Sequence, residues 1–121
     1  MPDHTREFTP TMTTLFRYSA LTYNAHKIHL DQTYTRQVEG FPDCLVHGPL
    51  TCTLLLSLIQ NQFPARHLTS FSYRALSPLF VNRTMTLNLK SNQDGLSGEA
   101  WAMDAQDGRV GMKGTFTLEE K

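Results

Sequence analysis

The sequence predicts one α+β domain in which an antiparallel sheet wraps around a central, strongly apolar helix. Two observations carry this prediction. Residues 48–62 bear apolar side chains at the spacing of a helix, whereas several later segments alternate apolar and polar residues with the period of two that is typical of strands. A chain of 121 residues is long enough for one domain with its own core. We expect the helix and the one-faced sheet to bury each other's apolar surface.

The first half of the chain is predicted to be helical. Residues 1–12 are interpreted as an N-terminal segment, and residues 13–47 as the short helices and loop that hold the candidate site. Thr13 or Thr14 is expected to cap a short helix that ends near Leu21, because a threonine oxygen can accept from the free amides of a first turn.

A loop and a second short helix are expected next. Residues 24–29 are interpreted as a loop. A helical segment follows from residue 31 to about residue 38 and ends at Gly40 and Pro42, which are residue types that stop helices. The histidine-rich part of the chain is therefore predicted to lie on a loop between two helices.

The central helix is predicted over residues 48–63. Leu50, Leu54 and Leu58 repeat at a spacing of four, and further aliphatic residues widen the apolar surface nearly all round. Pro49 fits the first turn, where its missing N–H costs no hydrogen bond. Such a helix must be enclosed by the rest of the protein.

Antiparallel strands are predicted over residues 68–118. Asp94-Gly95 and Asp107-Gly108 supply the positive φ angles that tight hairpin turns require, so the last three strands are expected to form a meander. Alternating patterns cover residues 70–75, 84–90 and 110–118, and a less regular one covers residues 96–103.

The charge balance argues against two classes of partner. Lysine plus arginine and aspartate plus glutamate both number 11, so the chain has no net field to attract nucleic acid or an anionic membrane surface. Residues 1–14 carry charges and lack the apolar stretch of a secretory signal, and residues 54–59 are too few to span a bilayer. We expect a soluble intracellular protein, cytoplasmic or mitochondrial, that is not secreted.

The two cysteines are expected to be free thiols. Cys44 and Cys52 do not form a close C-x-x-C pair, and the aliphatic content provides a core without a disulfide framework. Cys52 lies in a strongly apolar segment and is interpreted as a core residue.

Groups that can transfer protons gather in one stretch of the chain. Asn24, His26, His29 and Asp31 fall within eight positions, and His47-Gly48-Pro49 follows at the start of the predicted central helix. The amino end of a helix can stabilise a developing negative charge beside such groups. The residues alone leave the reaction class open.

Two motifs in this stretch resemble those of the MaoC-like hotdog dehydratase and hydratase family. In that family a pattern close to S-G-D-x-N-P-x-H precedes a later A/V-H-G-x-L at the start of the hotdog helix. Residues 46–50, V-H-G-P-L, are similar to the second pattern. In the first, Asn24 stands where the family usually has aspartate. His26 and Lys27 stand where it has asparagine and proline, and His29 stands where it has the catalytic histidine.

The resemblance extends over residues 8–118. The stretch R-Y-S-A-L-T-Y-N-A-H-K-I-H is most similar to the carboxy-terminal hotdog of fungal-type 3-hydroxyacyl-thioester dehydratases, in which asparagine also replaces the aspartate. The implied fold is a single hotdog. The implied activity is reversible hydration of a 2-enoyl thioester, or dehydration of a 3-hydroxyacyl thioester, carried on coenzyme A or an acyl carrier protein. The family implies no cofactor and no metal.

The resemblance also implies roles for individual residues. His29 would be the general acid and base, and Asn24 would position water, because an amide can orient water but cannot accept its proton. The backbone N–H of Gly48 would donate to the thioester oxygen. His26 and Asp31 are possible supporting residues, with Asp31 orienting His29.

Each of these residues also has a purely structural interpretation. His29 could cap a helix, Asn24 could bond its own loop backbone, and Gly48 could allow close packing. His47 is interpreted as a cap or packing residue and not as a catalytic one. The histidines lack a recognisable ligand spacing, so no metal site is expected.

Two other functions stay open. A hotdog thioesterase would need a carboxylate beside the thioester, for which Asp31 and Glu39 are the nearest candidates. A non-catalytic hotdog that binds an acyl group or supports a partner would explain the missing aspartate. Five arginines could meet the phosphates of the acyl carrier, and nothing selects among Arg17, Arg36, Arg66, Arg74 and Arg83.

A lone hotdog leaves a sheet edge open and a substrate tunnel incomplete. We therefore expect a dimer that forms a double hotdog, built from two copies of this chain or from one copy and a separate hotdog subunit.

Overall fold

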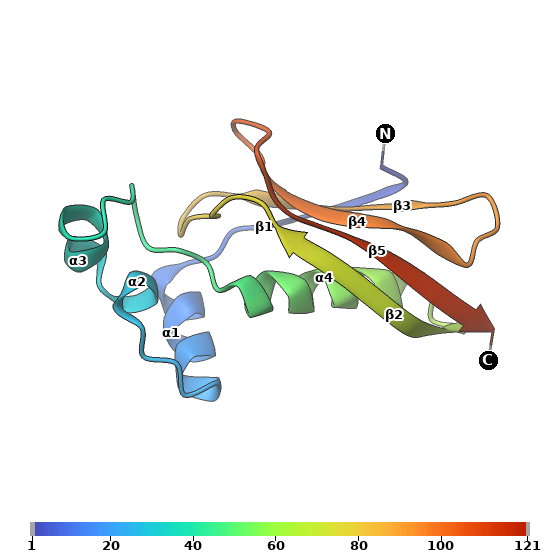
Figure 1. Cartoon of the computed structure of the whole chain (residues 1–121), viewed down its shortest axis with the longest axis horizontal. Helices are drawn as coiled ribbons and strands as arrows, with labels where there is room; N and C mark the ends of the chain where they lie inside the picture. The colour runs from blue at the N-terminus through green and yellow to red at the C-terminus, as the bar shows by residue number, and fades with distance from the viewer. Residues whose placement is uncertain (1, 121) are drawn as a thin grey trace.

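The computed structural model describes residues 2–120, so the outermost residues of the predicted 1–121 domain, Met1 and Lys121, lie outside the described part (Figure 1). Figure 1 shows the sheet lying over α4, with α1, α2 and α3 grouped beyond the amino end of α4. The α+β arrangement of an antiparallel sheet on one long helix is confirmed. In chain order the described elements are β1 (His4–Phe8), α1 (Met12–Leu21), α2 (Lys27–Leu30), α3 (Gln32–Gln37), α4 (Gly48–Gln62), β2 (Arg66–Ala75), β3 (Met85–Ser91), β4 (Ser97–Asp104) and β5 (Val110–Glu120).

The sheet has the strand order β1-β3-β4-β5-β2, and every neighbouring pair is antiparallel. The predicted meander is confirmed, because β3, β4 and β5 pair in sequence. Gly95 and Gly108, with φ angles of 68° and 72°, supply the left-handed backbone of the two connecting turns. The edges of the sheet are thus β1 and β2, which come from earlier in the chain.

The N-terminal segment, residues 1–12, contains a strand that the sequence did not predict. His4 to Phe8 form β1, in which His4 lies opposite Leu89 and Phe8 lies opposite Met85 of β3. The five residues have an exposed, largely polar pattern because they pair along one edge only. Their strand character therefore comes from a partner about eighty positions away and not from a local period.

The cap of α1 lies earlier than expected. Thr11, and not Thr13 or Thr14, is the N-cap residue, and its side chain accepts from the amide of Thr14 at 3.2 Å. The side chain of Thr14 in turn accepts from the amide of Thr11, also at 3.2 Å. Two free amides are satisfied by this reciprocal pair, which fixes the start of the helix at Met12.

The central helix begins at Gly48 as predicted, with Pro49 in its first turn, and ends at Gln62. The expectation that it would be enclosed all round is wrong for this chain. Its fully buried side faces the sheet, whereas Leu54 and Leu56 are half-buried, because a single sheet covers only one side of a helix. The buried residues of the helix are Thr51, Leu55, Leu58 and Ile59.

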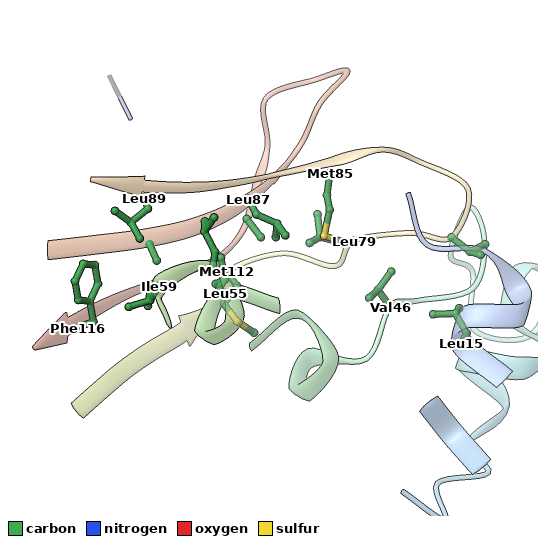
Figure 2. Close-up of a cluster of buried hydrophobic side chains, with 14 of the residues drawn as sticks. Leu15, Val46, Leu55, Ile59, Leu79, Met85, Leu87, Leu89, Met112 and Phe116 are labelled. Carbon is green, nitrogen blue, oxygen red and sulfur yellow. The ribbon is translucent and has the colours of Figure 1, made fainter. Parts of the chain in front are cut away.

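The core lies between α4 and the sheet (Figure 2). Figure 2 shows Leu55 and Ile59 of the helix directed toward Leu87 of β3 and toward Met112 and Phe116 of β5. The core continues toward α1, where Leu15 is fully buried.

Both cysteines are free thiols, as expected. Cys44 is fully buried, but Cys52 is only half-buried and packs at the margin of the core, so its assignment as a core residue is corrected. In the part of the chain that the structure describes, no helix has the length and apolarity needed to cross a membrane.

Candidate active site

His29 lies on a helix and not on the loop that the sequence predicts. The helix is α2, which spans only Lys27 to Leu30. His26 caps it, because the Nδ1 atom of His26 accepts from the amide of Ile28 at 3.3 Å. A helix of four residues is too short to produce a readable hydrophobic period.

A backbone carbonyl fixes the tautomer of His29. The Nδ1 atom of His29 lies 2.7 Å from the carbonyl oxygen of Leu45. A carbonyl oxygen can only accept, so Nδ1 carries the proton and donates it. In the neutral ring the lone pair is then on Nε2, which is the atom left to act as a base.

The surroundings of His29 favour the neutral ring. Burial lowers the pKa of His29 below its ordinary value of 6.5, the hydrogen bond to Leu45 opposes that shift, and His26 lowers the pKa further. His29 is therefore a neutral imidazole at pH 7, which is the form that can accept a proton.

His47 stacks directly on His29. The ring centroids lie 3.8 Å apart and the planes are inclined by 17°. The Nε2 atom of His47 is 2.8 Å from the hydroxyl oxygen of Ser19 in α1, while its Nδ1 atom is buried without a hydrogen-bond partner among residues 2–120. Burial, assisted by the nearby His29, lowers the pKa of His47 to about 4.

The structure decides between the two structural interpretations of His47. It occupies the N-cap position of α4, but its side chain makes no capping hydrogen bond. His47 is a packing residue whose ring faces His29 and Ser19. As a result, its side chain leaves the first amides of α4 without a cap.

Asn24 holds a turn beside α1. Its side-chain oxygen accepts from the amide of His26 at 3.1 Å, and its own amide donates to the carbonyl of Ser19 at 2.8 Å. This is the local loop role expected of an asparagine, although the left-handed residue of the turn is Tyr23, with φ of 55°. Asn24 is exposed and lines a cavity of about 370 Å³ together with Phe16, Ser19, Ala20, Tyr23, Ala25 and Leu30.

Gly48 opens onto a second cavity. This cavity has a volume of about 340 Å³, and Gly48 lines it together with Ala75 and Leu76 from the end of β2 and the residue after it. A Cβ atom built on Gly48 meets no heavy atom within 4 Å. The structure therefore gives no close-packing reason for a glycine at this position, since a Cβ atom would meet no atom of the elements around the helix.

His47 and Ser19 link three of the predicted site residues to one another. His47 connects His29, on which it stacks, with Gly48, which follows it in the chain. Ser19 connects His47 with Asn24, because its hydroxyl bonds the first and its carbonyl bonds the second. Both residues lie in stretches that carry the family resemblance, His47 in V-H-G-P-L and Ser19 in R-Y-S-A-L-T, but neither was expected to contact the other.

Asp31 does not orient His29. Its carboxylate caps α3, accepting from the amide of Tyr34 at 2.9 Å, and the Nδ1 position of His29 is taken by the carbonyl of Leu45. The other carboxylate considered, Glu39, accepts from the hydroxyl of Tyr34 at 2.8 Å. Both carboxylates thus serve α3.

Several charged groups are engaged in the chain's own structure. Arg36 pairs with Asp43, Arg83 pairs with Asp104, and Arg66 donates to the carbonyl of Gly95. Across residues 2–120, no group of three or more histidine, cysteine, aspartate or glutamate side chains has the geometry of a metal site.

The chain has the hotdog fold, which it shares with a solved MaoC-like dehydratase and with a solved (R)-hydratase. The solved MaoC-like dehydratase from Phytophthora capsici superimposes with a TM-score of 0.85 at 22% identity, covering 100% of this chain and 43% of that one. The (R)-hydratase of A. caviae involved in PHA biosynthesis gives a TM-score of 0.78 at 18% identity, covering 98% and 93% of the two chains. At such identities the likeness concerns the fold.

The sequence identifies the family. The family model for hydroxyacyl-thioester dehydratase type 2 matches residues 1–81, and the chain belongs to that family. It is 39% identical over 114 residues to mesaconyl-C(4)-CoA hydratase of Chloroflexus aurantiacus, and 39% identical over 89 residues to the mitochondrial hydroxyacyl-thioester dehydratase type 2 of Schizosaccharomyces pombe. The alignments cover 94% and 72% of this chain, but only 39% and 30% of those relatives.

Proposed function

We propose that the protein reversibly adds water to a 2-enoyl thioester, or removes it from a 3-hydroxyacyl thioester. His29 acts as general base in hydration and as general acid in dehydration. The observation that carries this proposal is the hydrogen bond from Nδ1 of His29 to the carbonyl of Leu45, because it leaves Nε2 as the proton-transferring atom.

The backbone N–H of Gly48 is the proposed donor to the thioester oxygen. The amide stands at the positive end of the fifteen-residue helix α4, where a developing enolate is stabilised by the helix dipole and by the free first-turn amides. The empty space in front of Gly48 and the absence of a side-chain cap from His47 support this role.

Asn24 is the proposed group that positions water. Its side-chain oxygen is engaged by the amide of His26, and the side-chain amide group can donate to a water molecule. Since an amide does not accept a proton, the proton passes through His29 alone. His26 is a supporting residue in this scheme through its cap of α2 and its ring contact with His29 at 6.1 Å.

The names of the relatives support this reaction class. One is named as a hydratase of a coenzyme A thioester and the other as a dehydratase of a hydroxyacyl thioester. We propose a thioester of coenzyme A or of an acyl carrier protein as the substrate. The mitochondrial name of the yeast relative supports an intracellular location, cytoplasmic or mitochondrial.

A second hotdog is the proposed partner. β2 is an edge strand, and Tyr73 on it and Leu76 just beyond it are 50% and 54% exposed. An open edge with apolar side chains is suited to pairing with another chain. A structural relative from Mycobacterium tuberculosis was solved as the ChsH1-ChsH2 complex, with a TM-score of 0.81 at 16% identity. We expect light scattering at micromolar concentration to show a dimer of this chain, or a monomer that forms a heterodimer when a second hotdog subunit is added. A protein that stays monomeric both alone and with such a subunit contradicts the proposal.

One assay tests the reaction. A short-chain 2-enoyl-CoA is supplied, and loss of the enoyl absorbance and release of free thiol are followed together. We expect loss of absorbance without thiol release, and a decrease of about 100-fold or more in His29→Ala. The matched control is His67→Ala, which removes an exposed histidine from β2.

The other outcomes identify the alternatives. Hydration that persists in His29→Ala contradicts the assignment of His29. Release of thiol indicates a thioesterase, for which the carboxylates of Asp31 and Glu39 are occupied at α3. If a sample shown to be folded and dimeric gives neither loss of absorbance nor release of thiol, the result indicates a non-catalytic acyl-binding or partner subunit.

A further inference from the structure

We propose that His47 is a positioning residue for His29, and that Ser19 holds His47 in place. The inference rests on the proposed function, in which His29 transfers the proton. Nothing in the reaction requires His47 to touch the substrate, so its contribution acts through the ring that it covers.

The first step of the argument is the packing of the rings. The ring of His47 has two aromatic neighbours, the ring of His29 at 3.8 Å and 17° and the ring of Tyr18 at 4.8 Å and 58°. His47 is 1% exposed. One face of His29 is therefore shielded from water by a buried side chain that also contacts Tyr18 and bonds Ser19.

The second step concerns the proton of His47. The hydroxyl of Ser19 is the hydrogen-bond partner of Nε2, and Nδ1 is buried with no partner among residues 2–120. When Nε2 of His47 carries the proton and donates it to Ser19, the buried Nδ1 atom is unprotonated and holds only a lone pair. Any other state places an N–H in the core without an acceptor, which is costly. Ser19 thus selects one neutral tautomer and one ring orientation.

The third step links His47 to the behaviour of His29. The neutral ring of His47 excludes water from one face of His29, and it supplies no negative charge that would stabilise the protonated form of His29. Loss of water is the largest cause of the lowered pKa of His29, and the carbonyl of Leu45 opposes it. The cover supplied by His47 therefore helps to keep His29 neutral and its ring in the orientation that the Leu45 bond requires.

The titratable groups around the stacked rings of His29 and His47 do not provide another explanation for the neutral state of His29. Tyr18 and His26 contact the pair through their rings. On the helix of His29, Lys27 lies over the ring of Tyr34 at 5.3 Å, and Asp31 accepts from the amide of Tyr34. Across residues 2–120, neither ring of the pair forms an ion pair with a carboxylate.

The segment that carries His47 adds no charge to the pair either. Cys44 lies 3.8 Å from the hydroxyl of Thr35, and burial raises the pKa of its thiol, so it is neutral at pH 7. Asp43 is bonded to Gln32 and Arg36, away from the stack.

The test is an NMR titration of the histidine side chains in the full chain. His29 is assigned from the signal lost in His29→Asn. We expect its midpoint to lie below 6.5 in the unmodified protein and to move up toward 6.5 in His47→Ala, which uncovers the ring. In His47→Phe the midpoint stays low, because a ring still covers His29. In Ser19→Ala it moves up by less than in His47→Ala, and in the control His67→Ala it does not move.

A kinetic measurement separates positioning from mere stability. With the short-chain 2-enoyl-CoA, the acidic limb of the kcat profile moves to higher pH in His47→Ala, together with the NMR midpoint, while KM is retained. An unchanged His29 midpoint in folded His47→Ala overturns the inference. If His47→Ala does not fold, an unchanged midpoint in Ser19→Ala overturns it.

The two proposals fail separately. If hydratase activity is absent but the His29 midpoint still moves up in His47→Ala, the role of His47 in holding and shielding the ring stands and the proposed function is contradicted. If the protein hydrates the enoyl thioester through His29 but the titration midpoint of His29 is unchanged in His47→Ala, the proposed function stands and the inference about His47 is contradicted.

Discussion

The carbonyl oxygen of Leu45 accepts a 2.7 Å hydrogen bond from Nδ1 of His29. Leu45 also donates its amide to the carbonyl of Ile28, while the next amide, of Val46, donates to the carbonyl of Leu79. The short stretch before α4 therefore attaches α2 on one side and the chain after β2 on the other. The tautomer of His29 is a consequence of backbone pairing and does not depend on a mobile side chain.

The pH dependence of hydration follows from the pKa of His29. Hydration needs the neutral ring, and burial lowers the pKa of His29 below 6.5. We expect kcat/KM for hydration to be constant above pH 7 and to fall as the pH drops through a midpoint below 6.5. Initial rates with a 2-enoyl-CoA between pH 4.5 and pH 8 measure this. A midpoint above 6.5 contradicts the assignment.

Two substitutions at Gly48 separate the backbone amide from the space around it. Gly48→Pro removes the N–H, and proline is tolerated at the first position of a helix. His47, at φ −61° and ψ 132°, already has the backbone that a residue before proline adopts. We expect a loss of about 100-fold to 1,000-fold in kcat for Gly48→Pro.

Gly48→Ala is the matched control for Gly48→Pro. It keeps the N–H, and its Cβ meets no protein atom within 4 Å. We expect both variants to retain the melting temperature. We expect Gly48→Ala to retain kcat and to show a higher KM, because its methyl group occupies space that the substrate would enter. Equal kcat in both variants contradicts a role for the amide.

The stability of the fold should fall in mildly acidic solution because of His47. In the unfolded chain this histidine binds a proton near its ordinary value of 6.5, whereas in the folded protein burial lowers its pKa to about 4. Between these values the unfolded state binds more protons, so the free energy of unfolding decreases as the pH falls from 6.5 to 4. The decrease is on the order of 3 kcal/mol at most, and His29 adds to it with the same sign.

Urea denaturation at pH 7 and at pH 4.5 measures this loss. In His47→Phe, which has no group that titrates at this position, the decrease between the two pH values should be smaller. An equal decrease in both proteins shows that other groups are responsible.

An ion pair between the buried carboxylate of Asp104 and the partly exposed Arg83, next to the β4–β5 turn, should stabilise the sheet. The carboxylate of Asp104, 1% exposed, accepts from Arg83 at 2.6 and 2.9 Å and from the amide of Gln106 at 2.8 Å. Asp104→Asn keeps the shape but loses the charge, and we expect a loss of about 1–3 kcal/mol in the free energy of unfolding. Thermal and urea denaturation measure it.

The surface pair of Lys113 and Glu99, 3.6 Å apart with both side chains about half exposed, provides the control. Glu99→Gln should change the free energy of unfolding by about 0–1 kcal/mol, because water screens this pair. Equal effects of Asp104→Asn and Glu99→Gln contradict the importance of burial.

The elements with local signals were predicted correctly. α4 follows from apolar residues at helical spacing bounded by Gly48 and Pro64, and the meander follows from alternation together with the Gly95 and Gly108 turns. β1 was missed because its five residues carry no period and gain their structure from β3. The cap of α1 was placed late because Thr11, Thr13 and Thr14 are chemically alike, and only the reciprocal bonds select among them.

The site was predicted in part for the same reason. His29, Asn24 and Gly48 were proposed as site residues from motifs, which lie along the chain. Their mutual arrangement depends on His47 and Ser19, and the hydrogen bond between these two joins residues 28 positions apart. No local pattern encodes such a contact, so the helical setting of His29 and the stack against it required the three-dimensional structure.

The pairing of β1 with β3 has a consequence for synthesis on the ribosome. The first strand can acquire its neighbour only after residues 85–91 have emerged, and α4 can cover its apolar side only when the meander exists. Until then the nascent chain displays an unpaired strand and an uncovered leucine-rich helix, which are the surfaces that chaperones bind and that aggregate when left alone. Folding of this domain is therefore delayed until β3, β4 and β5 have been synthesised.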